Sequence, residues 1–233
     1  MTWLDSPLFA IDTETTGLDT ETARIITCCV GWSPEPGKWT PRTWTINPGV
    51  PIPPEATKVH GITDADVADK PGPVEVLTEI REALTEAATT DTPIVGHNAV
   101  YDLTILDREF RRHLGEWLPY GLIVLDTLTL FRRFDLTTGS RSLESLASRH
   151  GITFPAHDAT EDALASLQLL HILAHENDLL PLVNPADLHR LQAGWHESQT
   201  LAAHYRRLAN GKHSDPPSTH WPLIPARTEG VAA

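Results

Sequence analysis

The sequence predicts an α/β protein built on a mixed sheet that helices cover on both faces. Three strand-like runs come first in the chain, and helical and strand-like segments alternate after them. Short apolar runs between turn signals are typical of buried strands, and apolar residues at spacings of three and four are typical of amphipathic helices. Three strands followed by alternating helices and strands give a mixed sheet with helices on both sides.

The first three strands are expected near the N-terminus. A short buried strand covers residues 8–12, and a longer run that is rich in β-branched residues covers 24–32. Residues 40–47 alternate Trp and Ile with polar neighbours, which suits a half-exposed antiparallel strand. A turn at 34–37 with two prolines and a glycine joins the last two strands, and prolines within 48–54 end the third.

Helices and buried strands alternate over the next hundred residues. The expected helices cover 73–88, 99–114, 142–151 and 158–176, and the expected strands cover 92–98 and 122–126. Asn98 is placed to cap the second of these helices. Gly151 closes the third. Asp158 with Glu161 resembles a capping box at the start of the fourth, with Asp in place of Ser.

The C-terminal part divides into a helix and a tail. Residues 185–209 are typical of an amphipathic helix. Its apolar stripe is expected to contain Leu188, Leu191, Trp195, Ala202 and Tyr205. Residues 210–233 contain four prolines and predict an extended tail, and the apolar residues within 218–226 indicate that part of it docks. We therefore expect an enzyme domain at 1–180 and a C-terminal helix and proline-containing tail at 181–233.

Composition favours a protein of a reducing compartment. The 233 residues are 40% hydrophobic, enough for a packed core. The longest apolar runs, such as 121–125, are far too short to span a bilayer, and the first ten residues lack the pattern of a signal peptide. Cys28 and Cys29 are neighbours in a strand and cannot readily bridge each other. We expect a cytoplasmic location and no membrane association.

The charge is acidic and uneven. The net charge of −13 argues against a large nucleic-acid footprint, which normally needs a basic face. Residues 1–102 hold 16 acidic and 6 basic side chains, whereas residues 103–149 hold 6 acidic side chains and 7 arginines. If the protein binds nucleic acid, it is expected to hold only a few phosphates with help from metal ions, as a reader of strand ends does.

Four acidic residues are expected to meet at one edge of the sheet. Asp12 and Glu14 are two apart at the end of the first strand, so they share a face. Like charges that close raise each other's pKa, and a divalent metal between them is the obvious remedy. Asp102 is in the first turn of the helix after the 92–98 strand, and Asp162 is in the first turn of the long helix, just after His157. Sites in open α/β sheets gather outside the carboxyl ends of strands.

These residues carry a resemblance to a known family. The segments "DTETTG" (12–17), "HNAVYD" (97–102) and "HDATED" (157–162) resemble the three motifs of the DnaQ-like, or DEDDh, 3′–5′ exonucleases, the type of RNase T and the DNA polymerase III epsilon subunit. The third motif fits the family form with histidine, and residues 47–63 resemble the family's connecting segment. The resemblance covers about residues 6–176. It implies a ribonuclease H-like fold with a mixed five-stranded sheet.

The resemblance also implies a two-metal-ion mechanism. Two Mg²⁺ ions, for which Mn²⁺ can substitute, are held by the four acids, because hard cations prefer oxygen ligands. Asp12 is expected to bridge both ions, Glu14 and Asp162 to hold the first, and Asp102 to support the second. His157 takes the proton of the attacking water as general base.

The same resemblance places the substrate. The residues expected to bind it are Thr13, Thr15, Thr16, Gly17, Leu18, His60 and Asn98. Leu18 is expected to wedge against the last base, and His60 to lie on the loop that covers it. His97 and Asp126 are expected to fix local structure, the latter as a helix N-cap. The arginines at 108, 111, 112, 132 and 133 are more often a solvated helix face than a phosphate track.

The predicted activity is a metal-dependent 3′–5′ exonuclease on single-stranded ends, with DNA in proofreading or repair preferred. Two alternatives stay open. The first is trimming of short RNA, because RNA and DNA are told apart by contacts to the 2′-OH that the sequence does not reveal. The second is a subunit whose main role is to dock on a DNA polymerase through residues 185–233.

Overall fold

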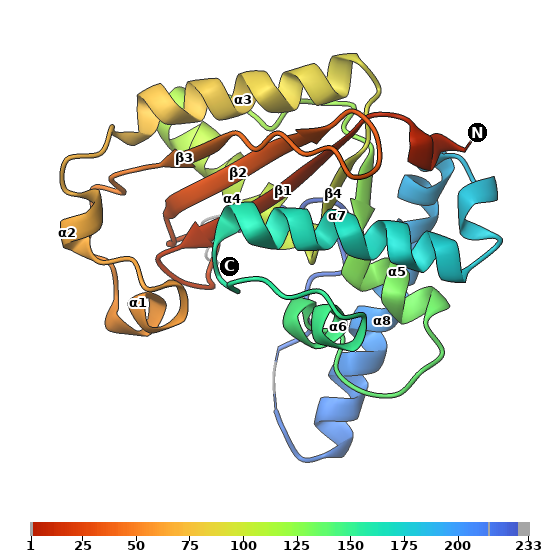
Figure 1. Ribbon diagram of the computed structural model, residues 1–233. Helices are drawn as coiled ribbons and strands as arrows, with labels where there is room; N and C mark the ends of the chain where they lie inside the picture. Colours follow the sequence, from red (N-terminus) through yellow and green to blue (C-terminus); the bar gives the residue numbers. More distant parts are fainter. Residues whose placement is uncertain (1, 214, 228–233) are drawn as a thin grey trace.

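A five-stranded mixed sheet forms the centre of the protein (Figure 1). The computed structural model describes residues 2–213 and 215–227. The strands are β1 (Leu8–Thr15), β2 (Ile25–Ser33), β3 (Thr43–Thr45), β4 (Ile94–Gly96) and β5 (Val124–Asp126), in the order β3-β2-β1-β4-β5. β1 pairs antiparallel with β2 and parallel with β4, so the direction of the sheet changes at β1. The predicted mixed sheet is confirmed.

Helices cover both faces of this sheet. The longer ones are α3 (Pro73–Thr89), α4 (Ala99–Leu114), α5 (Thr127–Phe134), α7 (Ala159–Glu176) and α8 (Pro185–Ala209). Three shorter ones are α1 (Pro54–His60), α2 (Asp64–Val67) and α6 (Leu143–Arg149). Short 3-10 turns cover Trp3–Asp5 and Leu180–Leu182. α7 lies across one face of the sheet, and α3 and α4 lie on the other (Figure 1).

The alternation of β1 assigns its side chains to the two layers. Phe9 and Ile11 pack in the apolar cluster with α3 and α4, whereas Leu8 and Ala10 pack in the cluster with α7. Because successive side chains of a strand point to opposite faces, Asp12 and Glu14 continue the α7 side and Thr13 continues the α4 side. The polar end of β1 therefore presents side chains to both faces of the sheet.

α8 closes the β5 edge of the sheet with hydrogen bonds. The backbone N–H of Asp126 donates to Oε1 of Gln192 at 2.8 Å, and Nε2 of Gln192 donates to the carbonyl of Val124 at 2.9 Å. Such bonds satisfy polar groups that an open sheet edge leaves unpaired. The predicted bounds of this helix are confirmed, but its predicted stripe is wrong at three exposed residues. Leu191 is 46% exposed, Tyr205 is 63% exposed, and Ala202 is exposed as well. The helix meets a polar sheet edge, so a buried amide takes a place expected to be apolar. The domain division at residue 180 stays a prediction.

The tail packs against the same chain. The N–H of Ile224 donates to Oγ1 of Thr104 at 3.1 Å, and Nη2 of Arg108 donates to the Ile224 carbonyl at 2.7 Å. Trp221 packs against the α3–α4 cluster. Arg108 is thus buried at 5% exposure, and the expectation that it belongs to a solvated helix face is wrong. Residues 228–233 of the predicted tail lie outside the described residues.

Helix ends follow the sequence signals with one exception. Asp126 caps α5 by accepting from the N–H of Leu128, and Asp158 caps α7 by accepting from the N–H groups of Thr160 and Glu161. Asn98 occupies the N-cap position of α4, but its side chain makes no capping bond. Its backbone is left-handed, with φ of 67°, and its N–H donates to Oδ1 of Asp126 instead.

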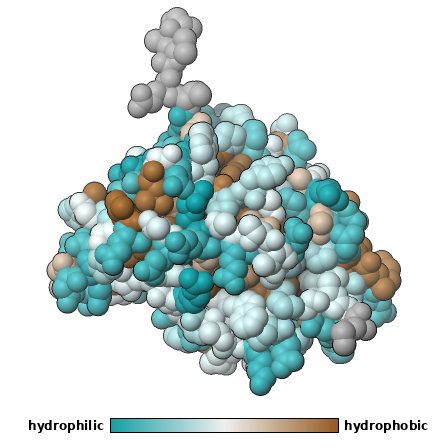
Figure 2. Space-filling view, turned by 90° about the horizontal axis from the view of Figure 1, so that it is seen from above, coloured by the Kyte–Doolittle hydropathy of each residue, from teal (hydrophilic) through white to brown (hydrophobic). Residues whose placement is uncertain are grey.

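Cys28 and Cys29 are buried and free. The face seen in Figure 2, on the side of α3, is mostly hydrophilic, with hydrophobic residues gathered in small patches. Within residues 2–213 and 215–227, no helix is long and apolar enough to cross a membrane.

Candidate active site

A cavity of about 660 Å³, which we call the acid cavity, lies beyond the carboxyl ends of β1 and β4. The end of β1 contributes Asp12 and Glu14 to its wall, and the start of α7 contributes Asp162 together with His157 from the preceding loop. His157 has a positive φ of 66°, which turns the chain sharply before α7 begins. This turn brings the loop over the α7 side of β1, where the strand alternation also directs both acids.

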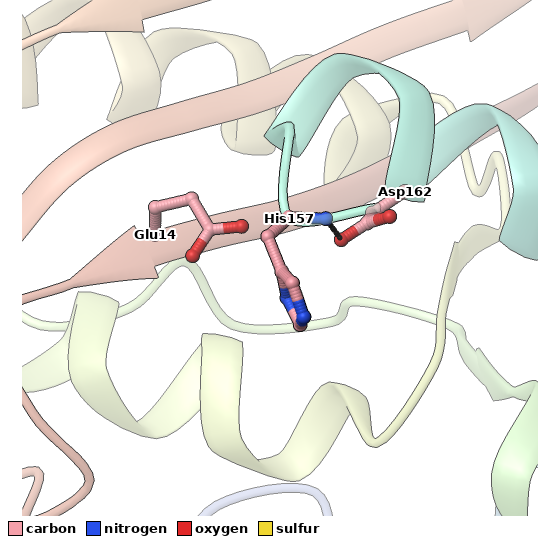
Figure 3. A group of neighbouring side chains, drawn as sticks. All are labelled: Glu14, His157 and Asp162. Carbon is pink, nitrogen blue, oxygen red and sulfur yellow. Dashed lines mark hydrogen bonds between the residues drawn. The ribbon is translucent and has the colours of Figure 1, made fainter. Parts of the chain in front are cut away.

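Three of these side chains form a compact group (Figure 3). Ligand atoms of Glu14, His157 and Asp162 all lie within 4.8 Å of one another. The backbone N–H of His157 donates to Oδ2 of Asp162 at 3.1 Å, which fixes that carboxylate. The other oxygen, Oδ1, is buried without a hydrogen-bond partner. An unpartnered carboxylate oxygen beside a second carboxylate can serve as a ligand for a cation.

Asp102 reaches the site from the other layer. It is buried in the first turn of α4 and accepts a hydrogen bond from Oγ1 of Thr13 at 2.7 Å. It is not one of the three residues of the compact group, and Thr13 connects it to β1. Asp102 still acts on the group electrostatically, because it raises the pKa of both Asp12 and Glu14.

All four acids have raised pKa values. Burial is the largest cause, and repulsion between the carboxylates adds to it for Asp12 and Glu14. The pKa of Asp12 lies well above its ordinary value, and that of Glu14 rises to about 8. Burial raises the pKa of Asp102 to about 7 despite the Thr13 bond, and that of Asp162 to about 6 despite the bond from His157.

The residues present fit a divalent metal ion. Their donors are carboxylate oxygens, which suit hard cations such as Mg²⁺. Their mutual repulsion and the unpartnered Oδ1 of Asp162 are features that a bound cation would relieve. The geometry that brings Glu14 and Asp162 together within 4.8 Å is suited to a shared ion.

A second cavity of about 610 Å³ adjoins the first and has an apolar wall. It is lined by Thr13, Glu14, Thr15, Thr16, Gly17, Leu18, Pro53, Glu55, Ala56, Val59, His60, Tyr101 and His157. Six of the seven predicted substrate residues are therefore together, and the seventh, Asn98, lines the first cavity. The Leu18 side chain is 90% exposed at the rim. His60 is the last residue of α1, so the expectation that it lies on a loop is wrong. We refer to this second cavity as the nucleotide pocket, because the terminal nucleotide is expected there from the sequence.

Two residues of the site were missed by the sequence analysis. The hydroxyl of Tyr101 donates to the Gly17 carbonyl at 2.6 Å and lies 2.6 Å from Oγ1 of Thr15, so it holds the loop after β1. Its place beside Asp102 was a usable signal. Oε1 of Glu144, from α6, lies 3.2 Å from Nε2 of His157. No local pattern identifies Glu144, because the chain brings α6 to this loop only in the folded state.

His97 and Asp126 make hydrogen bonds to the segments that surround the site. Nδ1 of His97 lies 2.8 Å from Oγ1 of Thr127, and Nε2 lies 2.9 Å from the carbonyl of Arg141. Burial lowers the pKa of His97 to about 4, so this ring is neutral near pH 7. Asp126 accepts from the N–H groups of Asn98 and Leu128. These bonds are structural and leave neither side chain free to react.

Comparison with known proteins agrees with this geometry. The sequence model of the Exonuclease family (RNase_T) matches residues 9–170. The DNA polymerase III subunit epsilon of Treponema pallidum (strain Nichols) is 31% identical over 170 residues, which cover 71% of this chain and 76% of that protein. The Haemophilus influenzae DNA polymerase III subunit epsilon is 37% identical over 109 residues, 46% of this chain and 40% of that protein. The chain thus spans less than half the length of the second relative.

Solved structures share the fold. Exonuclease X in complex with 5′-overhanging duplex DNA has a TM-score of 0.57 and 26% identity, covering 78% of this chain and 98% of that one. Escherichia coli exonuclease I in complex with a dT13 oligonucleotide has a TM-score of 0.66 and 21% identity, covering 75% and 42%.

Fold and acid cluster together define the class of ribonuclease H-like exonucleases, which are metal-dependent hydrolases. The chain belongs to the Exonuclease family, and DNA polymerase III epsilon subunits are among its relatives. The predicted resemblance is confirmed.

Proposed function

We propose that this protein uses Mg²⁺ to release nucleotides from the 3′ ends of single-stranded DNA. The observation that carries the proposal is the convergence of Glu14, His157 and Asp162 within 4.8 Å beside the nucleotide pocket. The family match over residues 9–170 supports the reaction type, and the oligonucleotide complexes of the structural relatives support the substrate.

The acids are assigned to the metal. Asp12, Glu14 and Asp162 would hold the ions, with Asp102 supporting them from the α4 side. When bound, such ions provide an activated water and neutralise charge on the scissile phosphate. Mn²⁺ shares the preference for oxygen ligands and is expected to substitute. Two ions are proposed because the resemblance to DnaQ-like exonucleases implies a pair, and three of these four acids line one cavity.

The remaining residues handle the proton and the nucleotide. His157 would accept the proton of the attacking water at a ring nitrogen, and Glu144 would hold the ring from Nε2. Thr13, Thr15, Thr16 and Gly17 would receive the terminal nucleotide through the β1 loop, which Tyr101 holds in place. Leu18 and His60 would enclose its base, and Asn98 would contact the strand on the side of the acid cavity.

DNA is preferred to RNA because the named relatives are DNA polymerase subunits and DNA-bound exonucleases. This makes proofreading or repair in the cytoplasm the proposed role. Trimming of short RNA is the alternative within the same chemistry, and the sugar preference distinguishes the two.

The test is a direct assay of strand shortening. The protein is incubated with 3′- and 5′-labelled single-stranded DNA and RNA in Mg²⁺, Mn²⁺ or EDTA. We expect metal-dependent shortening from the 3′ end, faster on DNA, and none with Asp12→Asn. Asp69→Asn, which removes an exposed acid that lines neither cavity, is the matched control and should behave as wild type. No shortening of any substrate with either metal would refute the proposal.

A polymerase is the proposed protein partner. The names of the epsilon relatives support it, and the C-terminal region is the proposed contact. The tail around Trp221 and Ile224 is already packed on α4, so the exposed Tyr205 of α8 is the better probe. Purified polymerase should co-elute with the wild type and less with Tyr205→Ala. Equal co-elution of both would exclude this surface, and none with the wild type would exclude the partner.

A further inference from the structure

An arginine-lined groove of about 560 Å³ continues from the acid cavity. Arg132 and Arg141 line both spaces, and Arg206 and Gln199 line only the groove. The acid cavity shares Thr13, Glu14 and His157 with the nucleotide pocket. The three spaces therefore adjoin one another in a row, with the carboxylates between the nucleotide pocket and the groove.

The three arginines come from three separate elements. Arg132 is on α5, Arg141 is on the loop before α6, and Arg206 is on α8. Gln199 ties two of these elements together, because its Nε2 donates to the carbonyl of Thr129 in α5 at 3.1 Å. Arg206 lies beyond residues 9–170, so the C-terminal helix adds a cation to a site built by the exonuclease core.

Two of the guanidinium groups are free to take a ligand. Within residues 2–213 and 215–227, Arg132 and Arg206 form no ion pair, and the Nε of Arg206 donates only to the carbonyl of Ala202 in its own helix, at 3.2 Å. Arg141 is held more firmly. Its Nη2 donates to the Asp135 carbonyl at 3.0 Å, and its Nε lies 3.3 Å from Oδ2 of the same residue.

The arginines repel one another. The pKa of Arg132 is lowered, chiefly by burial and also by the nearby charges of Arg206 and Arg141, although Asp126 acts in the opposite sense. Positive charges that line one groove favour the binding of an anion between them. The arrangement stands out in a chain whose net charge is −13.

We propose that this groove binds the phosphates of single-stranded DNA on the 5′ side of the scissile bond. The inference rests on the proposed function, since the strand must place its 3′ end in the nucleotide pocket. A strand that leaves the carboxylates on the opposite side enters the space lined by Arg132, Arg141 and Arg206. Guanidinium groups bind phosphate oxygens through paired N–H donors, so arginine suits this role.

The groove gives binding a dependence on strand length. A very short oligonucleotide reaches the nucleotide pocket and the acids, whereas a longer one also reaches the arginines. Each phosphate contact with a single strand releases counterions and adds about 0.7 to the slope of log affinity against log salt. Length dependence and salt slope are therefore the two quantities to measure.

The experiment measures binding without turnover. Fluorescence anisotropy of labelled dT3 and dT12 is recorded in EDTA for the wild type, Arg132→Gln and Arg206→Gln over a range of salt concentrations. Arg207→Gln removes the same charge from the neighbouring residue of α8, which does not line the groove, and serves as matched control. Arg206→Lys keeps the charge. Circular dichroism and melting temperature establish that each variant is folded.

We expect Arg132→Gln and Arg206→Gln each to weaken dT12 binding about tenfold, the usual worth of one charge-assisted hydrogen bond. The loss should be smaller for dT3. The salt slope should fall by about 0.7 in each variant and be largely retained in Arg206→Lys and Arg207→Gln.

If Arg132→Gln and Arg206→Gln leave the affinity for dT12 and its salt slope unchanged, the proposal that the groove binds phosphates is overturned. An equal loss in Arg207→Gln would also overturn it, because general charge would then explain the effect. A separate arm tests the proposed function by itself. The wild type is given the p-nitrophenyl ester of thymidine 5′-phosphate, which is too short to reach the arginines. If the protein hydrolyses neither this ester nor DNA, the proposed exonuclease activity is refuted. The measured effect of the arginines on DNA binding is independent of that outcome.

Discussion

The acid cavity and the arginine groove adjoin at Arg132 and Arg141 as two halves of the proposed strand path, and they hold their charges in different ways. The carboxylates stand on the end of a central strand and on the first turns of two helices, where Thr13 and the backbone of His157 fix two of them. Arg132 and Arg206 stand on α5 and α8 with long side chains that form no ion pair with any residue the structure describes. A reacting phosphate must be positioned to a fraction of an ångström, whereas a passing strand needs mainly positive charge.

The acid cavity and the arginine groove also favour ligands of opposite charge. The carboxylates have pKa values raised by burial and by one another, so they favour a cation. The arginines repel one another and favour an anion. A metal-bound nucleic acid would relieve both. The comparison is tested by changing the two halves separately, beginning with the residues that contact the reacting groups.

The largest effect is expected for Asp162→Asn. The change removes a charge from the compact group and should lower turnover well beyond the roughly 10–100-fold cost of losing an outer contact to a metal site. Stability in EDTA should not fall, because one source of repulsion is gone. Hydrolysis of labelled DNA and the melting temperature in EDTA measure the two quantities. A marked drop in the metal-free melting temperature would show that the carboxylate is structural instead.

His157→Asn should have the next largest effect. Asn tolerates the positive φ of 66° at this position better than Ala does, so the loop before α7 keeps its shape. Loss of a general base lowers kcat by about 10²–10⁴-fold. Binding of Mn²⁺, followed by calorimetry, should be largely retained. An unchanged kcat would remove His157 from proton transfer.

Thr13→Val should have a smaller effect. It removes the hydroxyl that donates to Asp102 and keeps the shape of the side chain. Loss of an outer contact to a metal-binding group costs about 10–100-fold in activity. The pKa of Asp102 should rise further, because the hydrogen bond favours its charged form, and the acidic limb of the pH–rate profile should move upward. Thr78→Val, on the exposed side of α3, is the control and should leave the profile in place.

The smallest expected effect is that of Mg²⁺ on the free energy of unfolding. Mg²⁺ at a hundred times its dissociation constant adds about 2.7 kcal/mol, or about 5–10 °C in melting temperature for a chain of this size. The pKa values of Asp162 and Glu14, about 6 and about 8, exceed their unfolded values. The metal-free folded chain therefore binds the extra protons, and its stability falls as pH rises through this window.

The Mg²⁺ increment has the opposite pH dependence. Metal binding requires the deprotonated carboxylates, so the increment should grow between pH 6 and pH 8. Melting curves with Mg²⁺ and with EDTA at several pH values measure both trends. An increment that is equal at both ends of the window would contradict the assignment of Glu14 and Asp162 to the metal.

Much of the core was predictable because its signals are local. The apolar runs located β1 and β2, although β1 continues to Thr15, three residues beyond its predicted end at residue 12. Helical spacing placed α4 and α7 to within one residue. The short α1 and α2 were not predicted, since they follow the prolines at 48–54 without any apolar periodicity. The stripe of α8 was misjudged for a similar reason, because a sheet edge recruits a polar residue such as Gln192.

The sequence by itself determined which acids belong together. Asp12 and Glu14 share a face through strand alternation, and Asp102 and Asp162 follow from the first turns of their helices. Only the tertiary structure decided what surrounds them. Glu144 meets His157, and Arg132, Arg141 and Arg206 line one groove, although they are far apart in the sequence. Local periodicity fixes the direction of a side chain within its own element, whereas these contacts depend on how separate elements pack.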